Sequence, residues 1–256
     1  MRHFDRQYMS LIRELATAQF KLTHQEAYLG FLWSFLHPLL ILTCFYVMFS
    51  ARFSSEIENF PVYLLIGIVH VTHFSSTTAS GLHTLRKMRG FTTNTLFPKE
   101  TLVIGSVVAG TVEFVVSLGI CVLIAIMVGT SMGLSLLLLP LVVVLQFVLT
   151  IWVSLLLSCC AVFVFDLGYV YQIFLRLLLF VTPVFYTLSF IGEGLPRTVI
   201  QINPLTHLMN LSRRLLIQGD GSLSSAILWF ILINAVLIVV SLAVFRTLEP
   251  RFAEEL

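Results

Sequence analysis

Few side chains in this sequence could do chemistry within an apolar environment, and they are scattered. His70 and His73 are three residues apart, so a helix would place both imidazoles on one face, where they could bind a metal ion or relay a proton. No carboxylate or thiol is near them in the sequence. Polar packing between helices is therefore the stronger interpretation, and we predict no metal site.

Two isolated charges, Glu113 and Arg176, fall within long apolar segments. A lone carboxylate at the middle of a membrane costs about 3 kcal/mol, so Glu113 should face protein or water, or be protonated. An ion-coupled carrier usually needs more such groups than these two. The vicinal thiols of Cys159 and Cys160 could react or bind metal, but small apolar side chains in a span usually serve packing.

Sequence motifs for catalysis are absent. The chain has no GxxxxGK[ST] phosphate loop, no HExxH and no GxSxG, and its acidic residues are not paired in a polar loop. We therefore predict no catalytic residue, no ATPase site of its own and no resident cofactor. What remains is a membrane channel or transport subunit whose energy comes from elsewhere, so we predict that the chain is not an enzyme.

The composition requires elements that cross a membrane. The 256 residues are 58% hydrophobic and only 11% charged, against about 25% charged in an average soluble protein. Lipid offers no hydrogen bonds, so each crossing must be a helix of about 20 residues. We predict an all-α polytopic membrane protein with six transmembrane helices, at about 30–50, 60–82, 102–128, 134–162, 169–190 and 223–245.

Two segments of the chain are not predicted to cross the membrane. Residues 1–28 are predicted as an N-terminal amphipathic helix in the membrane interface, with Tyr8, Leu11 and Leu15 on one face and Arg13 on the other. Residues 29–256 then form the six-span domain. Within it, 191–222 is half-polar, and we expect short helices broken at Asn203-Pro204 between the fifth and sixth spans.

The basic residues favour one orientation. With six spans, 11 of the 15 Lys and Arg residues lie on the side of the termini and 4 on the other side. By the positive-inside rule both termini are cytoplasmic. The basic loop 85–100, which carries Arg86, Lys87 and Arg89, also falls on the cytoplasmic side, where a partner could contact it.

Aromatic residues could line a path for sugars. The chain has 22 Phe, 7 Tyr and 3 Trp, and aromatic faces can stack on sugar rings while tolerating lipid. The alternative is that they pack between helices or anchor them at the interface. The candidates are Trp33, Tyr46, Tyr171, Phe185 and Tyr186.

A series of motifs resembles a known family. The first span opens on Leu-Gly-x-x-Trp-x-x-Leu-x-Pro, formed by Leu29, Gly30, Trp33, Leu36 and Pro38. Later motifs are Phe60-Pro61-Val62 with Leu64, Leu65 and Gly67, then Phe74-Ser75-Ser76, Glu113, Thr182-Pro183 with Tyr186, and Asn203-Pro204-Leu205 with His207, Leu211, Ser212 and Arg213. In this order and spacing, over most of the chain, they resemble the transmembrane (permease) subunit of type-2 ABC exporters of capsular polysaccharide, O-antigen or teichoic acid.

The resemblance implies partners and roles. It implies a homodimer in the bacterial inner membrane with two copies of a separate P-loop ATPase, which would hold ATP and Mg, and a lipid-linked polysaccharide as cargo. Periplasmic and outer-membrane export proteins would join in a capsule system, and no nucleic acid is involved. The ATPase contacts would come from the N-terminal helix with Arg13, the loop with Arg86, Lys87 and Arg89, and the junction at Asp166. The exit-side segment would include Asn203, Pro204, Arg213 and Arg214.

Some alternatives stay open within this resemblance. Asn203 to Arg213 looks more like capsule exporters, whereas Thr182 to Tyr186 looks more like O-antigen exporters. Many relatives have an arginine before Asp166, but this chain has Phe165. Arg213 and Arg214 could contact headgroup or glycan, or reach the interface by snorkelling. The cargo could instead be a small lipid or drug, and an integral-membrane transferase is the least favoured alternative.

Overall fold

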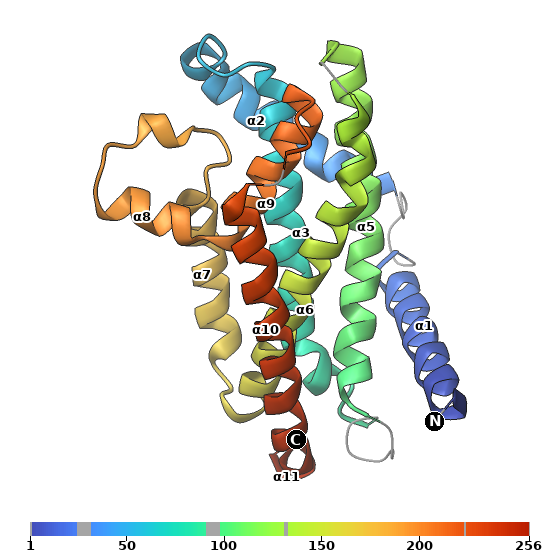
Figure 1. Ribbon diagram of the computed structural model, residues 1–256. Coiled ribbons are helices and arrows are strands. Elements are labelled where there is room, and N and C mark those ends of the chain that lie inside the picture. Colours follow the sequence, from blue (N-terminus) through green and yellow to red (C-terminus); the bar gives the residue numbers. More distant parts are fainter. Residues whose placement is uncertain (1, 25–31, 91–97, 131–132, 223, 256) are drawn as a thin grey trace.

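The computed structural model describes residues 2–24, 32–90, 98–130, 133–222 and 224–255, in which every regular element is a helix (Figure 1). The main helices are α1 (Arg2–His24), α2 (Trp33–Phe53), α3 (Phe60–Lys87), α5 (Glu100–Val128), α6 (Leu139–Phe163), α7 (Leu167–Val181), α8 (Leu195–Ile202), α9 (Pro204–Arg213) and α10 (Ser225–Leu248). Short elements are the 3-10 helices η2 (Leu134–Leu138), η3 (Leu188–Phe190) and η5 (Glu249–Arg251), the π-helix η4 (Arg214–Gln218) and α11 (Phe252–Glu255).

Five of the described helices are long and apolar enough to cross a membrane. They are α2, α3, α5, α6 extended by η2, and α10 extended by η5. Helix α7 is apolar but has 15 residues, which at 1.5 Å per residue is about 22 Å, short of a hydrocarbon core of about 30 Å. The structure therefore confirms a helical, multi-span membrane protein.

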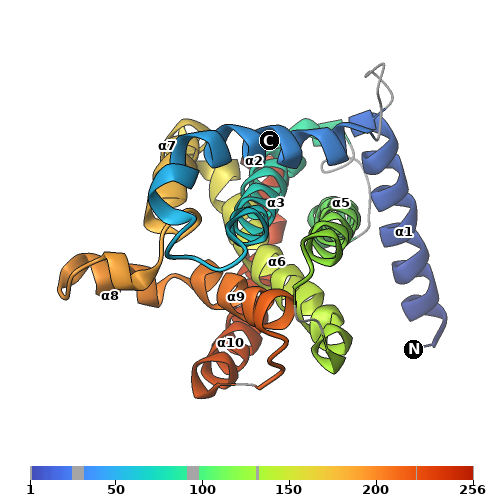
Figure 2. The ribbon, with the colours of Figure 1, turned by 90° about the horizontal axis from the view of Figure 1, so that it is seen from above.

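Helix α3 is the centre of the bundle. Figure 2 shows it surrounded by α2, α5, α6, α7 and α9, and most of its side chains are buried. Small residues allow this close packing: a Cβ on Gly81 would lie 2.7 Å from Cβ of Ser154 on α6. In contrast, α2 crosses the other long helices obliquely and leaves much of its surface exposed (Figures 1 and 2).

The N-terminal helix is present and lies against α5. Ile12 and Ala16 are buried, whereas Arg13 and Glu14 are exposed, in agreement with the amphipathic pattern. Gly105 on α5 makes the contact possible, because a Cβ there would lie 3.0 Å from Cβ of Leu15. The first described turn of α1 and the C-terminal helix α11 lie at the same end of the bundle (Figure 1).

The predicted fifth span differs from the structure. The sequence predicts a helix over 169–190, but α7 ends at Val181 and only the short η3 follows. Pro183 explains this, because a proline disfavours helical dihedrals in the preceding residue. Thr182 accordingly adopts an extended conformation with ψ 130°. The predicted break at Asn203-Pro204 is confirmed: the Asn203 side chain accepts a hydrogen bond from Leu205 N and caps α9.

The second predicted span also differs at its end. Helix α3 continues beyond residue 82 to Lys87, so the basic residues Arg86 and Lys87 extend the helix instead of beginning a loop. Cations are favourable at a helix C-terminus, where the backbone carbonyls point. Residues 91–97, the middle of the predicted basic loop 85–100, lie outside the described residues.

Candidate functional site

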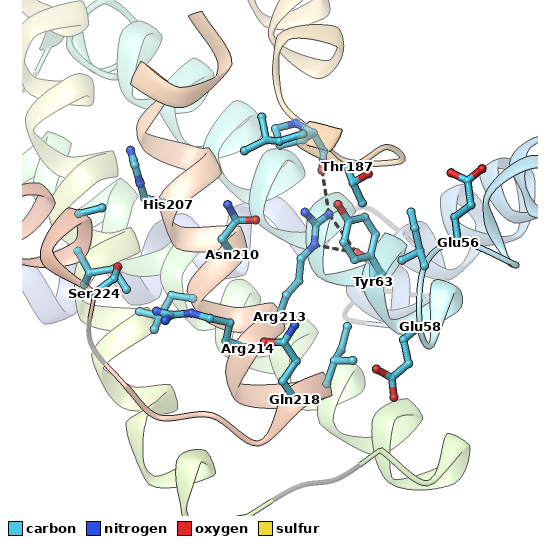
Figure 3. A pocket seen from close by; sticks show the side chains of 17 residues that line it. Glu56, Glu58, Tyr63, Thr187, His207, Asn210, Arg213, Arg214, Gln218 and Ser224 are labelled. Carbon is cyan, nitrogen blue, oxygen red and sulfur yellow. Dashed lines mark hydrogen bonds between the residues drawn. The ribbon is translucent and has the colours of Figure 1, made fainter. Parts of the chain in front are cut away.

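A polar cavity of about 580 Å³ (Figure 3) lies where α9 and the α2–α3 turn meet, towards the end of the bundle opposite the termini (Figure 1). The turn between α2 and α3 forms one wall with Glu56 and Glu58, and α9 forms another with His207 and Asn210. The remaining polar lining comes from Tyr63, Thr187, Arg213, Arg214, Gln218 and Ser224. Cations, carboxylates and amides thus surround one hollow.

Arg213 holds one wall of this cavity together. It is 5% exposed, and its Nη2 donates to the carbonyl oxygens of Pro183 at 2.9 Å, Val184 at 3.0 Å and Tyr63 at 3.2 Å. Its guanidinium carbon lies 3.4 Å from the centre of the Tyr63 ring. Since Arg213 is buried and bound to protein carbonyls, the snorkelling interpretation of Arg213 is wrong.

Gly67 makes room for this arrangement. A Cβ at Gly67 would lie 3.0 Å from Cγ1 of Val184, 3.1 Å from Nη2 of Arg213 and 3.1 Å from Cε of Met209. The absence of a side chain therefore lets α9 and the turn after α7 approach α3 closely enough for the guanidinium to reach their carbonyls.

The π-helix η4 shapes the floor of the cavity. A π-turn inserts an extra residue into a helix and so changes which way its side chains point. Here Arg214 and Gln218, the first and last residues of η4, both line the cavity. Arg214 Nη1 lies 3.9 Å from Asp220 Oδ2. The backbone N–H and the hydroxyl of Ser222 donate to Asp220 and hold the pKa of its carboxyl below the usual value, with a further contribution from Arg214.

A buried polar network lies between α3, α6 and α9. His70 Nδ1 lies 3.0 Å from Oε1 of Gln146, and its Nε2 lies 2.8 Å from the hydroxyl of Ser212. Gln146 Nε2 also contacts Nδ1 of His73 at 3.2 Å. The histidines therefore serve polar packing between helices, as the sequence favours, and no group of three metal-ligating side chains occurs within the described ranges.

Glu113 lies beside this network. It is half-buried and lines a small cavity of about 70 Å³ together with His37, His73 and Ser76. The cavity lies between α2, α3 and α5. Arg176, the other isolated charge, is exposed on α7.

The aromatic candidates fall into two groups. Trp33 and Tyr46 on α2 are exposed, 46% and 39% respectively. Tyr171 is buried and donates to the Thr78 hydroxyl at 2.6 Å. Tyr186 is buried and donates to the Phe180 carbonyl at 2.8 Å, and Phe185 stacks on Phe49 with ring centres 4.6 Å apart. Phe185 and Tyr186 are adjacent in the sequence, and their rings meet edge to face with centres 5.2 Å apart.

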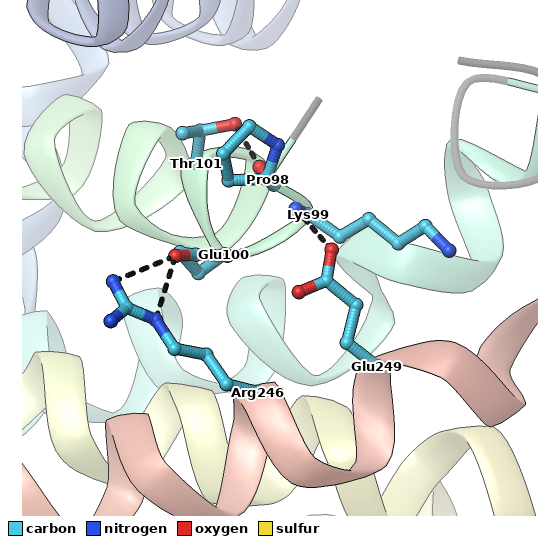
Figure 4. A network of polar contacts seen from close by, with 6 residues as sticks. All are labelled: Pro98, Lys99, Glu100, Thr101, Arg246 and Glu249. Carbon is cyan, nitrogen blue, oxygen red and sulfur yellow. Dashed lines mark hydrogen bonds and ion pairs between the residues drawn. The ribbon is translucent and has the colours of Figure 1, made fainter. Parts of the chain in front are cut away.

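At the end of the bundle that carries the termini, hydrogen bonds and an ion pair join the start of α5 to the end of α10 (Figure 4). Glu100 is 2% exposed, and its Oε1 accepts from both Nε and Nη2 of Arg246 at 3.2 Å. Glu249 Oε1 accepts from the backbone N–H of Lys99 at 3.0 Å. These contacts join Lys99 and Glu100, the last residues of the predicted basic loop, to the C-terminal segment.

The predicted ATPase-contact residues at the end of α3 and before α7 also lie at this end, whereas Arg13 lies halfway along α1 and the loop 91–97 is outside the described ranges. Arg86 stacks on Phe165, with its guanidinium carbon 4.2 Å from the ring centre, and donates to the Phe165 carbonyl at 3.3 Å. The resemblance leads us to expect an arginine at position 165, where this chain has Phe165. The Arg86 side chain, which comes from α3, places a guanidinium at the same junction. Lys87, Arg89, Arg13 and Asp166 are exposed, and Asp166 precedes α7.

Sequence reasoning missed several of the residues that organise these sites. Glu100, Arg246 and Glu249 were not singled out, nor were Tyr63 and Gln146. A partial signal existed for Glu100 and Arg246, since each charge borders an apolar segment and has to find a partner or water. No local pattern indicates which partner that is.

Comparisons with known proteins agree on one family. The family model described as ABC-2 type transporter matches residues 10–217. The chain is 26% identical over 251 residues to the O-antigen export system permease protein RfbA of Myxococcus xanthus, covering 98% of this chain and 96% of that protein. Two Klebsiella pneumoniae proteins of the same name are 27% and 24% identical, each covering 95% of this chain and 94% of the relative.

Proposed function

Because the chain belongs to the ABC-2 type transporter family, we propose that it is the permease half of an ATP-driven exporter of a lipid-linked polysaccharide, with O-antigen as the favoured cargo. The supporting observation is that three relatives named O-antigen export system permease align with it over nearly their full lengths. Such a match covers the whole membrane domain, including the segments between spans.

The proposed topology has six crossings in the inner membrane, with both termini in the cytoplasm. Helix α7 runs from the end that carries α11 towards the opposite end, and residues 182–190 continue beyond it (Figure 1). If α7 and residues 182–190 together form a crossing, the chain has this crossing in addition to those of the five long helices, six in all. An even number of crossings places both termini on the same side. The excess of Lys and Arg at that side supports a cytoplasmic location. In this topology α1 lies in the cytoplasmic interface.

The chain would act as a homodimer with two P-loop ATPase subunits. The exposed basic residues Lys87 and Arg89, with Arg86, would contact the ATPase, and α1 with Arg13 would lie beside them. The Glu100–Arg246 ion pair and the Lys99–Glu249 hydrogen bond link the start of α5 to the end of α10. A displacement of Lys99 and Glu100 by the ATPase would therefore move α5 and α10 together. The supporting observation is that this end of the bundle carries both the basic residues and the ion pair.

Deletion of the chain tests this proposal. We expect loss of long-chain surface polysaccharide, measured by gel electrophoresis and immunoblot, with lipid-linked polymer retained on the cytoplasmic side, and full rescue by the intact chain. Affinity purification should recover a stoichiometric P-loop ATPase with ATP turnover. Normal surface polysaccharide combined with sensitivity to a small molecule would contradict the proposed cargo.

A further inference from the structure

The cavity opposite the termini contains a buried donor that has no protein partner. Among the described residues, Nη1 of Arg213 is buried without a hydrogen bond, although Nε and Nη2 of the same side chain donate to backbone carbonyls. Arg213 is 95% buried, and it lines the cavity. A buried N–H without an acceptor costs free energy, and a ligand oxygen would remove this cost once a small shift of the cavity wall exposes Nη1.

The other polar groups of the cavity include both hydrogen-bond donors and hydrogen-bond acceptors. Asn210 and Gln218 carry amides, which do both, and Figure 3 shows them beside Arg213 between α9 and the α2–α3 turn. Glu56 and Glu58 are exposed acceptors at one side of the cavity, and Glu56 is paired with Arg52. A ligand that presents many hydroxyl groups matches this mixture, because each hydroxyl is both donor and acceptor.

The charges argue against a phosphate ligand. The two guanidinium groups of Arg213 and Arg214 face the two carboxylates of Glu56 and Glu58 across one hollow, so the lining carries no net charge. Arg214 is in addition near Asp220, at 3.9 Å. A pyrophosphate headgroup would gain from the arginines but would be repelled by the carboxylates, whereas a neutral polyol meets no such repulsion.

The size and walls of the cavity also fit a sugar. A volume of about 580 Å³ is within the range of small-ligand sites. Apolar side chains of Leu188, Leu211 and Ile227 complete the lining, and these can contact the C–H faces of a sugar ring. The wide π-turn η4 is also typical of functional sites, and three of its residues, Arg214, Ile217 and Gln218, line this cavity.

We propose that this cavity is a carbohydrate-binding subsite, which holds a hydroxyl-rich unit of the polysaccharide as it leaves the bundle at the end opposite the termini. The proposal rests on the proposed export function and specifies where the chain recognises its cargo. Asn210 and Gln218 bind sugar hydroxyls, and a small shift of the cavity wall on binding lets Arg213 Nη1 donate to a sugar oxygen.

The test uses the purified permease–ATPase complex in lipid nanodiscs. The probe is short oligosaccharide prepared by mild acid hydrolysis of the surface polysaccharide of the same cells, and binding is measured by saturation-transfer difference NMR. We expect Gln218→Ala and Asn210→Ala each to weaken binding about tenfold, as expected for the loss of hydrogen bonds in a polar site. Gln201→Ala is the matched control, because Gln201 is an exposed glutamine on α8 outside the cavity.

The possible outcomes are distinguishable. Equal binding by the wild type, Gln218→Ala and Asn210→Ala would overturn the subsite, as would binding of sodium pyrophosphate in place of the oligosaccharide. No oligosaccharide binding by the wild type, in cells whose surface polysaccharide still depends on the chain, would overturn the subsite and leave the export function intact. Surface polysaccharide that is independent of the chain would instead overturn the export function.

Discussion

The guanidinium group of Arg213 lies over the ring of Tyr63, 3.4 Å from its centre, while its nitrogens donate to the Tyr63, Pro183 and Val184 carbonyl oxygens. One side chain on α9 thereby joins the first turn of α3 to the turn that follows α7. Because Pro183 and Val184 lie in the non-helical turn after α7, the arginine supplies their carbonyls with donors that no regular helix provides. The shape of the cavity depends on this contact.

Replacement of Arg213 by lysine should destabilise the protein. Lysine keeps the charge, but it lacks the planar fork that reaches several carbonyls at once and stacks on an aromatic ring. We expect the free energy of unfolding to fall by about 2 kcal/mol, measured by thermal unfolding in detergent. Arg197→Lys on α8 is the control and should change little. Equal stability of both variants would mean that the Arg213 contacts carry no net energy.

Replacement of Gly67 by alanine should disturb the same contact from the other side. The new methyl group would press on Val184, Met209 and the Arg213 guanidinium at 3.0 to 3.1 Å, and overpacking of this kind costs about 1–3 kcal/mol. The same substitution at Gly119 on α5 meets nothing within 4 Å and should be neutral or slightly stabilising, since alanine is the better helix former. Thermal unfolding of the two variants side by side checks this, and a Gly67→Ala variant as stable as Gly119→Ala would refute the crowding.

The Glu100–Arg246 ion pair should show energetic coupling. Glu100 is 2% exposed, so removing Arg246 leaves a buried carboxylate without its cationic partner. In a double-mutant cycle of Glu100→Gln and Arg246→Gln, we expect a coupling energy of about 1 kcal/mol in the free energy of unfolding. Glu193→Gln combined with Arg246→Gln serves as a control, and these two changes should be additive. Additivity in both cycles would show that the pair is not coupled.

Charge reversal at the basic end of α3 should uncouple transport from ATP hydrolysis. With Arg86, Lys87 and Arg89 all changed to glutamate, we expect the affinity for the ATPase subunit to fall at least about tenfold, because the glutamates would repel the acidic partner surface that the three cations attract. Export and stimulated ATPase activity should fall with it, whereas membrane insertion should not change. Arg197→Glu, a reversal outside this end, should leave both activities intact. Unchanged export in the triple variant would remove the coupling role of these residues.

Much of the fold follows from the sequence alone. Continuous apolar segments predict the five long helices to within a few residues at most ends, because a lipid-facing backbone must be helical. Asn203-Pro204 predicts the start of α9, because the asparagine caps a helix and the proline occupies its first turn. Pro183 could have predicted the end of α7, but the long apolar segment around it favoured a continuous span.

The sites depended on tertiary structure. Glu100 and Arg246 are 146 residues apart, and His70 is 142 residues from Ser212, yet both pairs are in hydrogen-bond contact. The sequence determines which segments are helical, since that depends on local backbone and lipid exposure. A helix that is apolar on every side, however, does not indicate which face meets which neighbour. Helix packing decides that, and with it the partners of Arg213 and the position of the cavity around it.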